Sequence, residues 1–174
     1  MLKHWDGLLN TDCTVMSIRN HVLYPIFRVG YTSLSEVCEK KYTNNEIKAC
    51  EDIKVMIRDP EQRFVSGVNE YCRQNKITIQ QAWPRIEKGQ LMDRHFAPQY
   101  MWLLHLYKYY KGHVIILPFD YISKITSVHK RKGEQHEQVP LIQSFVEVDR
   151  ALMQHYNEKI ELGVLIERYR DVLS

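Results

Sequence analysis

The segment IKVMIRDPEQRFVS, residues 53–66, decides the fold because it joins two kinds of secondary structure. Its first part, Ile53–Ile57, is a short apolar run with β-branched residues, which is typical of a buried strand. Asp59 and Gln62 fit the start of a capped helix, and Pro60–Gln74 follows with apolar residues on one face. The segment therefore predicts a strand that runs directly into a helix.

Other parts of the chain repeat this alternation of strand and helix. Further strands are predicted at His21–Phe27 and His113–Leu117, and further helices at Pro98–Tyr110, Leu141–Tyr156 and Lys159–Leu173. The polar stretch Val128–Pro140 is the best candidate for a loop. Alternating strands and helices predict an α/β fold, with residues 1–174 as a single domain and a mainly parallel central sheet flanked by helices. Such sheets bind ligands outside the carboxyl ends of their strands.

Composition narrows the function classes. The 174 residues carry 24 Lys and Arg against 21 Asp and Glu, a net charge of +3 that is too mild to indicate a nucleic-acid partner. The four cysteines form no CxxC pair and no HExxH motif occurs, so we expect reduced thiols and no metal site. The longest apolar run, Val114–Leu117, is far too short to span a membrane, and the first residues lack a signal-peptide pattern. A cytoplasmic protein is expected.

The residues after the first predicted strand, RVGYTSL (28–34), have the features of a phosphate-binding turn. Gly30 permits a tight turn or a close backbone approach, and Ser33 with Glu36 fits a capping box that opens a helix. A helix start presents backbone N–H groups to an anion, and Arg28 adds a permanent charge. An ordinary capped turn between strand and helix is the alternative explanation.

The residues after the second predicted strand are candidates for another phosphate contact. Arg58 stands at the carboxyl end of the strand, and Arg63 and Ser66 lie one helical turn apart on one face. Two arginines and a hydroxyl can converge on a phosphate. The alternative is a surface helix whose arginines are solvated or paired with Glu61 or Glu70, and such an exposed pair contributes only ~0–1 kcal/mol.

Four segments together resemble one enzyme family. Arg58 and Ser66, eight positions apart after a strand, resemble the 3′-phosphate motif of sulfotransferases that use 3′-phosphoadenosine 5′-phosphosulfate (PAPS). Phe27–Leu34 is similar to the 5′-phosphosulfate loop of that family. Residues 131–133 (RKG) resemble a late loop that covers the 3′-phosphate in many members, and residues 95–99 (HFAPQ) resemble a stretch of the carbohydrate-type members.

The resemblance implies a P-loop-NTPase-like sulfotransferase fold and transfer of a sulfuryl group from PAPS, without a metal, to a hydroxyl or amine acceptor, a carbohydrate being one candidate. The implied PAPS contacts are Arg28, Gly30, Tyr31, Thr32, Ser33, Arg58, Ser66, Arg131, Lys132 and Gly133. The family usually carries Lys where Arg28 stands, to stabilise the bridging oxygen as sulfate leaves. Arg28 supplies charge and paired hydrogen bonds but does not readily give up a proton.

Transfer to a hydroxyl also needs a general base. His95 is the first candidate because an unperturbed histidine titrates near neutral pH. A structural histidine that caps the helix starting near Pro98 is the alternative. The other candidates for the base are Glu36, Glu39, His129 and His136.

Other functions remain open on the same residues. The short chain and the arginine at position 28 suit a sulfotransferase-like module that binds a nucleotide or a sulfated ligand without turnover. A kinase would need an atypical loop, because GxxxxGK[ST] and a Mg²⁺-binding carboxylate pair are missing. Nucleic-acid binding is least favoured, since the basic stretch Lys124–Lys132 is short and acidic residues follow it. The acceptor and the oligomeric state stay undetermined.

Overall fold

A computed structural model describes residue 9, residues 13–127 and residues 135–173. Within them the chain forms one six-stranded sheet with the strand order β3-β1-β2-β4-β5-β6. The strands are β1 (Met16–Ile18), β2 (His21–Leu23), β3 (Lys40–Lys41), β4 (Asp52–Ile57), β5 (His113–Pro118) and β6 (Lys159–Glu161). The two six-residue strands β4 and β5 lie side by side in the buried part of the sheet, so they form its structural centre.

The sheet is mixed, which corrects one part of the sequence-based prediction. β2 pairs with β4 and β4 with β5 in parallel, and the long β4–β5 register runs from Asp52 opposite His113 to Ile57 opposite Pro118. β1, β3 and β6 each pair in antiparallel fashion, so the prediction of a mainly parallel sheet is wrong although the α/β class is confirmed. These outer strands have only two or three residues, too few to show an apolar pattern in the sequence.

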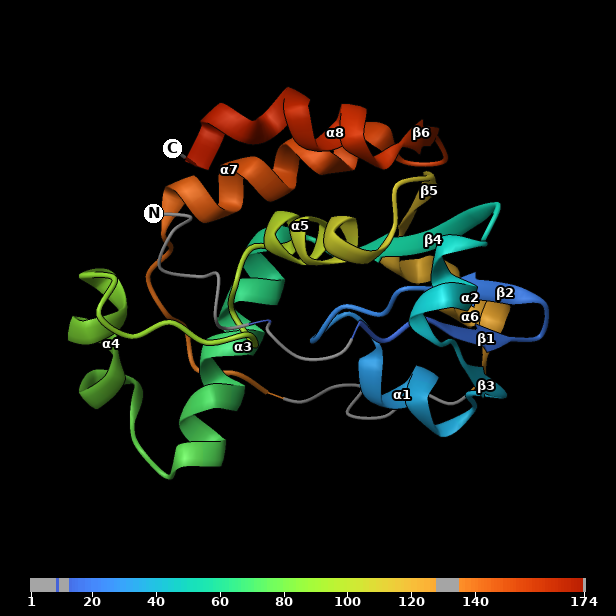
Figure 1. The fold of residues 1–174 in the computed structure, drawn as a ribbon. Coiled ribbons are helices and arrows are strands. Elements are labelled where there is room, and N and C mark those ends of the chain that lie inside the picture. The colour runs from blue at the N-terminus through green and yellow to red at the C-terminus, as the bar shows by residue number, and fades with distance from the viewer. Residues whose placement is uncertain (1–8, 10–12, 128–134, 174) are drawn as a thin grey trace.

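Helices pack around the sheet (Figure 1). They are α1 (Tyr31–Glu36), α2 (Asn44–Lys48), α3 (Pro60–Asn75), α4 (Ile79–Glu87), α5 (Gln99–Tyr109), α6 (Ile122–Ile125), α7 (Gln143–Leu152) and α8 (Leu162–Tyr169), with short 3-10 turns at Phe119–Tyr121, Met153–His155 and Arg170–Leu173. α7 packs against α3 and α5, and α8 packs against α5. No helix in the described residues is long and apolar enough to cross a membrane.

The helix after β4 forms as the sequence predicts. The Asp59 carboxylate accepts a hydrogen bond of 2.9 Å from the Gln62 backbone N–H, and Pro60 is the first helical residue. The helix ends at Asn75, where Lys76 takes a left-handed conformation with φ 54°. The strand-to-helix connection that decides the fold is therefore confirmed.

Two predicted segments have other boundaries in the structure. β2 ends at Leu23 rather than at Phe27, because Pro25 has no N–H to donate to the sheet. The predicted helix Lys159–Leu173 is wrong in its first three residues, which form β6 against β5. Only Ile160 of these three is buried, and this alternation suits an edge strand.

A buried carboxylate fixes the start of α5. Asp149 on α7 accepts hydrogen bonds from the backbone N–H groups of Gln99 (2.7 Å) and Tyr100 (3.0 Å), and it also accepts one from the Gln99 side chain (3.3 Å). The Gln99 side chain in turn bonds both the N–H and the C=O of Arg58, each at 2.9 Å. The position of the Arg58 backbone therefore depends on α5 and α7.

Arg63 is part of the same buried framework. Its side chain is only 1% exposed, and its guanidinium donates to the carbonyl oxygens of Phe27 (3.1 Å) and Ala97. Burial lowers the pKa of Arg63 to about 10, so the group keeps its charge at neutral pH. Arg63 therefore ties the loop after β2 to the segment before α5, while its buried Nη2 has no hydrogen-bond partner among the described residues. Its contacts show this framework role, and a phosphate contact shared with Arg58 and Ser66 stays a prediction.

We expect the Asp149→Asn variant to report on this framework. Burial raises the pKa of Asp149 to about 6, and attraction to Arg63 with the three hydrogen bonds only partly offsets that burial. The folded protein then keeps a proton that the unfolded chain has lost, so this group's contribution to stability falls as pH rises from about 4 to 6.

Asparagine cannot titrate, and its amide NH₂ faces backbone donors. The variant should lose roughly 1–3 kcal/mol of unfolding free energy at pH 4. The difference in unfolding free energy between the variant and the parent protein should become smaller from pH 4 to pH 6, as measured by urea denaturation at several pH values. A difference that stays constant would show that Asp149 is ionised in the folded state throughout this range.

Candidate functional site

The carboxyl ends of the three parallel strands meet at one edge of the sheet. Arg28 lies in the loop after β2, Arg58 follows β4 directly, and Phe119 follows β5. The Arg58 guanidinium donates to the backbone oxygen of Arg28 at 3.2 Å and lies over the Phe119 ring, 5.4 Å from its centre. The two arginines that follow β2 and β4 therefore lie beside each other at this edge of the sheet.

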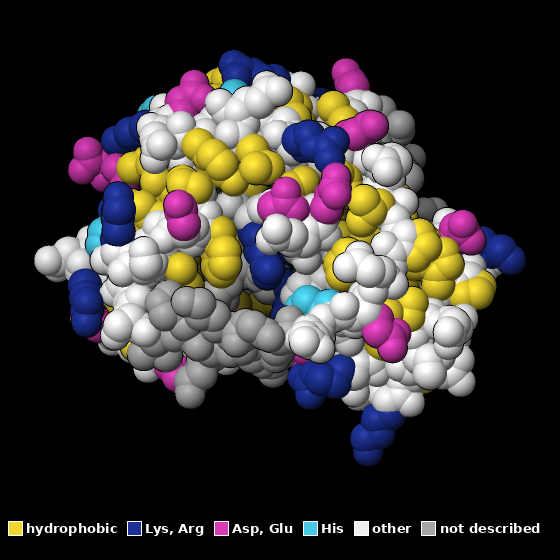
Figure 2. Space-filling view, turned by 180° about the vertical axis from the view of Figure 1, so that it is seen from behind, with side chains coloured by type: hydrophobic (Ala, Val, Ile, Leu, Met, Phe, Trp, Pro, Cys, Tyr) yellow, Lys and Arg dark blue, Asp and Glu magenta, His cyan; other side chains and the backbone are white. Residues whose placement is uncertain are grey.

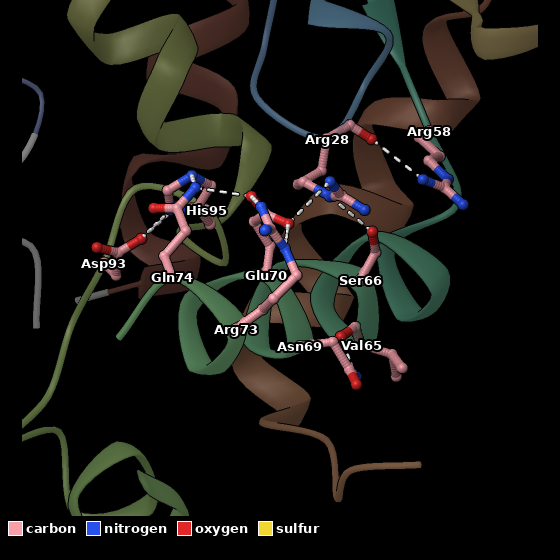
Figure 3. A network of polar contacts seen from close by, with 10 residues as sticks. All are labelled: Arg28, Arg58, Val65, Ser66, Asn69, Glu70, Arg73, Gln74, Asp93 and His95. Atoms are coloured by element: carbon pink, nitrogen blue, oxygen red, sulfur yellow. Dashed lines mark hydrogen bonds and ion pairs between the residues drawn. The ribbon is translucent and has the colours of Figure 1, made fainter. Parts of the chain in front are cut away.

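Arg28 connects this edge to the first half of α3. Its Nε donates to the Ser66 hydroxyl at 2.7 Å, and its Nη1 lies 3.6 Å from the Glu70 carboxylate (Figure 3). Ser66 is fully buried, and the Arg28 backbone has a φ of 65°, a region that side-chain-bearing residues rarely adopt. The loop therefore accepts backbone strain at the position that turns this arginine toward α3.

Gly30 forms the tight turn that the sequence predicts. Its φ is 74°, and a Cβ placed there would overlap the side chain of Ile122 on α6. The expected capping box is wrong, because α1 begins at Tyr31 with Gly30 as its N-cap. Ser33 lies buried inside this helix, and Glu36 is its last residue.

The remaining loop residues differ in their surroundings. Tyr31 packs its ring against Phe27 with 4.5 Å between ring centres, whereas Thr32 is exposed at the start of α1. α1 has six residues, so its dipole adds little to anion binding here. The arginines and the Ser66 hydroxyl are the main polar groups of the candidate site.

The electrostatics of Arg58 favour an anion. Burial, followed by the charge of Arg28, lowers its pKa, which means that the charged side chain is held in an unfavourable environment. Its Nε is buried and has no hydrogen-bond partner among the described residues. An unsatisfied cationic donor beside a second arginine fits a phosphate or sulfate group.

Glu70 is the residue that sequence reasoning did not place in the site. Its side chain is 4% exposed and accepts hydrogen bonds from Arg73 (2.6 and 3.1 Å) and from Gln74 (2.7 Å), besides its ion pair with Arg28. Ser66, Glu70 and Gln74 follow one another at intervals of four, a spacing that places them on one face of α3. The alternative of a surface helix that pairs Arg58 or Arg63 with Glu61 or Glu70 is wrong, because Arg63 is buried and the partners of Glu70 are Arg28 and Arg73.

Glu61, the other carboxylate considered as a partner for the arginines, lies away from the candidate site. Glu61 forms an exposed ion pair with Arg150 on α7, with 2.7 Å between Oε1 and Nη2. Both side chains are about half exposed, so the pair contributes little to stability. It lies outside the network of Figure 3.

His95 joins the network from the other side. Its Nδ1 lies 2.5 Å from Asp93 Oδ1, and the same oxygen accepts the His95 backbone N–H at 2.8 Å. Its Nε2 is 3.4 Å from the Gln74 amide, which also donates to Glu70 (Figure 3). Burial alone would raise the pKa of Asp93, but the hydrogen bonds and charge of His95 lower it overall. An ionised Asp93 favours the proton on Nδ1 and leaves Nε2 as an acceptor.

His95 does not cap α5. The first residue before that helix is Pro98, and Asp149 accepts the first helical N–H groups. A Cβ on Gly67 would overlap the His95 carbonyl, so this glycine lets α3 approach the His95 segment closely. Gly67 within a helix is a sequence signal that could have indicated this contact.

The other predicted site residues are dispersed. Glu36, the last residue of α1, and Glu39, just after the helix, are exposed. His136 lies in the segment that Asn69 holds against α3 through hydrogen bonds to Glu137 (2.9 and 3.0 Å). The predicted residues that fall outside the described part of the chain are His129, Arg131, Lys132 and Gly133.

Figure 2 shows Lys and Arg side chains in a hollow near the centre of one face, with a histidine close by. Around it, basic and acidic side chains are interspersed with hydrophobic ones. Among the described residues, no group of three or more His, Cys, Asp or Glu is placed to hold a metal ion. In comparisons with known proteins, no family model, no curated protein and no solved structure matches this chain.

Proposed function

We propose that this protein is a sulfotransferase of the P-loop-NTPase-like fold that moves a sulfuryl group from PAPS to a hydroxyl or amine acceptor. The observation that carries the proposal is the meeting of Arg28, Arg58 and Ser66 at the carboxyl ends of adjacent parallel strands. The unpartnered, buried Nε of Arg58 supports an anionic ligand there. The same three residues belong to the segments that carry the family resemblance. Ser66 lies 38 positions and Arg58 lies 30 positions from Arg28 in the chain.

Each residue has a role in holding the nucleotide. Arg58 and Ser66 bind the 3′-phosphate, and Arg28 with the turn at Gly30–Ser33 binds the 5′-phosphosulfate. The 2.7 Å bond between Arg28 and Ser66 links these two positions directly. The family resemblance adds Arg131, Lys132 and Gly133, which lie outside the described residues, to the proposed 3′-phosphate contacts.

In this proposal Arg28 exchanges one ionic partner, Glu70, for another, the nucleotide. In the structure Arg28 lies near the carboxylate of Glu70, which Arg73 and Gln74 also contact. An incoming phosphosulfate competes with Glu70 for the Arg28 guanidinium, while Arg73 continues to balance the charge of Glu70. The nucleotide therefore binds without leaving a buried carboxylate uncompensated.

The chemistry follows from the His95–Asp93 pair. His95 Nε2 takes the proton from the acceptor hydroxyl, and the hydroxyl oxygen forms a bond to sulfur as the sulfur–oxygen bond to the 5′-phosphate breaks. Asp93 stabilises the imidazolium that results. Arg28 stabilises the negative charge that develops on the departing phosphate, which leaves with the bonding electrons as 3′-phosphoadenosine 5′-phosphate (PAP).

A binding module without turnover is the second candidate. Two observations favour it: an arginine occupies the position where the family usually has lysine, and Glu70 neutralises part of the charge of that arginine. Such a module would bind the nucleotide through the same residues. Only a transfer assay separates it from the enzyme.

Nucleotide binding is tested first with Arg58→Ala. Loss of an ionic hydrogen bond costs roughly 1.5–3 kcal/mol, so PAP affinity should fall about ten- to a hundredfold in calorimetric titration. Arg85→Ala, at an exposed position on α4, is the matched control and should bind PAP like the parent protein. Equal binding of AMP and PAP by the parent protein, or unchanged affinity in Arg58→Ala, would exclude the assigned 3′-phosphate site.

The base is tested with His95→Gln in a sulfate-transfer assay over a panel of hydroxyl and amine acceptors. We expect transfer to fall at least about a hundredfold, with PAP affinity retained, because general-base catalysis contributes roughly 10²–10⁴-fold. Asp93→Asn should give an intermediate loss and move the acidic limb of the pH–rate profile. His113→Gln, at an exposed position on β5, is the control. A parent protein that binds PAP but transfers to no acceptor would establish the binding module instead.

A further inference from the structure

A pocket of about 290 Å³ opens beside the loop that carries Arg28. Phe27 and Tyr31, which flank Arg28 and Gly30 in the sequence, both contribute to its wall. The rest of the wall includes Tyr24, Pro25, Arg94 and Trp102. This volume is at the lower end of the range for small-molecule sites, so it suits a ligand of one ring.

The wall offers flat apolar surfaces. The ring centre of Phe27 lies 5.0 Å from that of Trp102 and 4.5 Å from that of Tyr31. The Tyr24 hydroxyl is paired with His105 Nδ1 at 2.8 Å, so it adds no unsatisfied polar atom to the wall. Aromatic faces of this kind stack on a planar ring or on the apolar face of a sugar.

Two donors give the pocket a preference for acidic ligands. Trp102 is 6% exposed, and its buried Nε1 has no hydrogen-bond partner among the described residues. An indole N–H is a donor only, so it requires an acceptor atom. Arg94 lines the same pocket, with its exposed guanidinium 4.8 Å from the centre of the Phe27 ring. A carboxylate meets both requirements.

We propose that this pocket binds a hydroxylated ring compound bearing an acidic group, and that this compound is the sulfuryl acceptor. The first half stands on the pocket alone, and the second half rests on the proposed function. Phe27 connects the two sites, because its ring contacts the pocket on one side and the His95 ring, 5.4 Å between centres, on another. Transfer places the sulfuryl group on the ring hydroxyl, releases PAP and gives the hydroxyl proton to His95.

The test measures ligand binding without nucleotide and then with saturating PAP. The probes are 4-hydroxybenzoate and glucuronate, which share a hydroxylated ring and a carboxylate but differ in ring type, and methyl 4-hydroxybenzoate, which lacks the charge. We expect one of the two acids to bind with a Kd of millimolar order or below, and the uncharged ester to bind at least about fivefold more weakly than its acid. The acid that binds identifies an aromatic or a sugar ligand.

Variants locate the binding. Arg94→Gln and Trp102→Phe should each weaken binding of the acid by at least about fivefold, while PAP affinity stays unchanged. Arg94→Gln removes an ionic hydrogen bond, and Trp102→Phe removes a buried donor. Arg85→Gln is the exposed control. If neither acid binds, or if Arg94→Gln binds it as well as the parent protein does, the pocket assignment is overturned.

The outcomes keep the two proposals apart. If PAP fails to bind but an acid binds in an Arg94-dependent manner, the pocket assignment stands and the acceptor role falls with the proposed function. If PAP binds and neither acid does, the nucleotide site stands and the pocket proposal is wrong. If the acid binds but receives no sulfuryl group from PAPS while another acceptor does, its role as acceptor is excluded.

Discussion

The paired hydrogen bonds between the Gln99 side chain and the backbone of Arg58 are the constraint on which the candidate site depends. Backbone N–H and C=O groups at the end of a strand have left the sheet, and buried groups of this kind need partners. Gln99 supplies both, and Asp149 holds Gln99 by accepting its backbone and side-chain N–H groups. The strand end is thereby fixed by a helix start and by a carboxylate from a third element.

This arrangement explains why two arginines can lie close together. Arg63 bonds carbonyl oxygens from the loop after β2 and from the segment before α5, so the two loops cannot move apart without exposing a buried cation. Within that frame, Arg28 and Arg58 face the same region despite their mutual repulsion. Glu70 offsets part of their charge through Arg28, and the Nε of Arg58 remains the donor that an anion would satisfy.

The network also joins the two arginines of the candidate site to His95 through one helix. α3 carries Ser66, Glu70 and Gln74 at intervals of one turn, and these contact Arg28 at one end and His95 at the other. Gly67 allows the His95 segment to approach the same helix. Glu70 and Gln74 therefore connect Arg28 with His95 through a chain of polar contacts.

The sequence predicted the elements that carry the candidate site because their signals are local. A β-branched run, an N-cap aspartate and a proline define the β4–α3 connection within eight or so residues, and a glycine marks the turn after β2. The outer strands β1, β3 and β6 and the helices α2 and α4 were not predicted as such. The strands are too short to show a period, and their formation depends on neighbours distant in the chain.

By itself, then, the sequence determined the α/β class, the order of the central strands and helices, and which residues follow the strands. Only the tertiary structure decided which of these residues are buried in the framework and which meet at the candidate site. Arg63 and Arg58 have the same side chain and lie five positions apart, yet they differ in their surroundings. Arg63 is almost fully buried and donates to the carbonyls of Phe27 and Ala97, whereas Arg58 is partly buried and lies beside Arg28 and the Phe119 ring. Partners such as Glu70 for Arg28, or Asp149 for Gln99, lie 42 and 50 positions away in the chain. Local patterns cannot contain such pairs, because burial and the packing of separate elements create them.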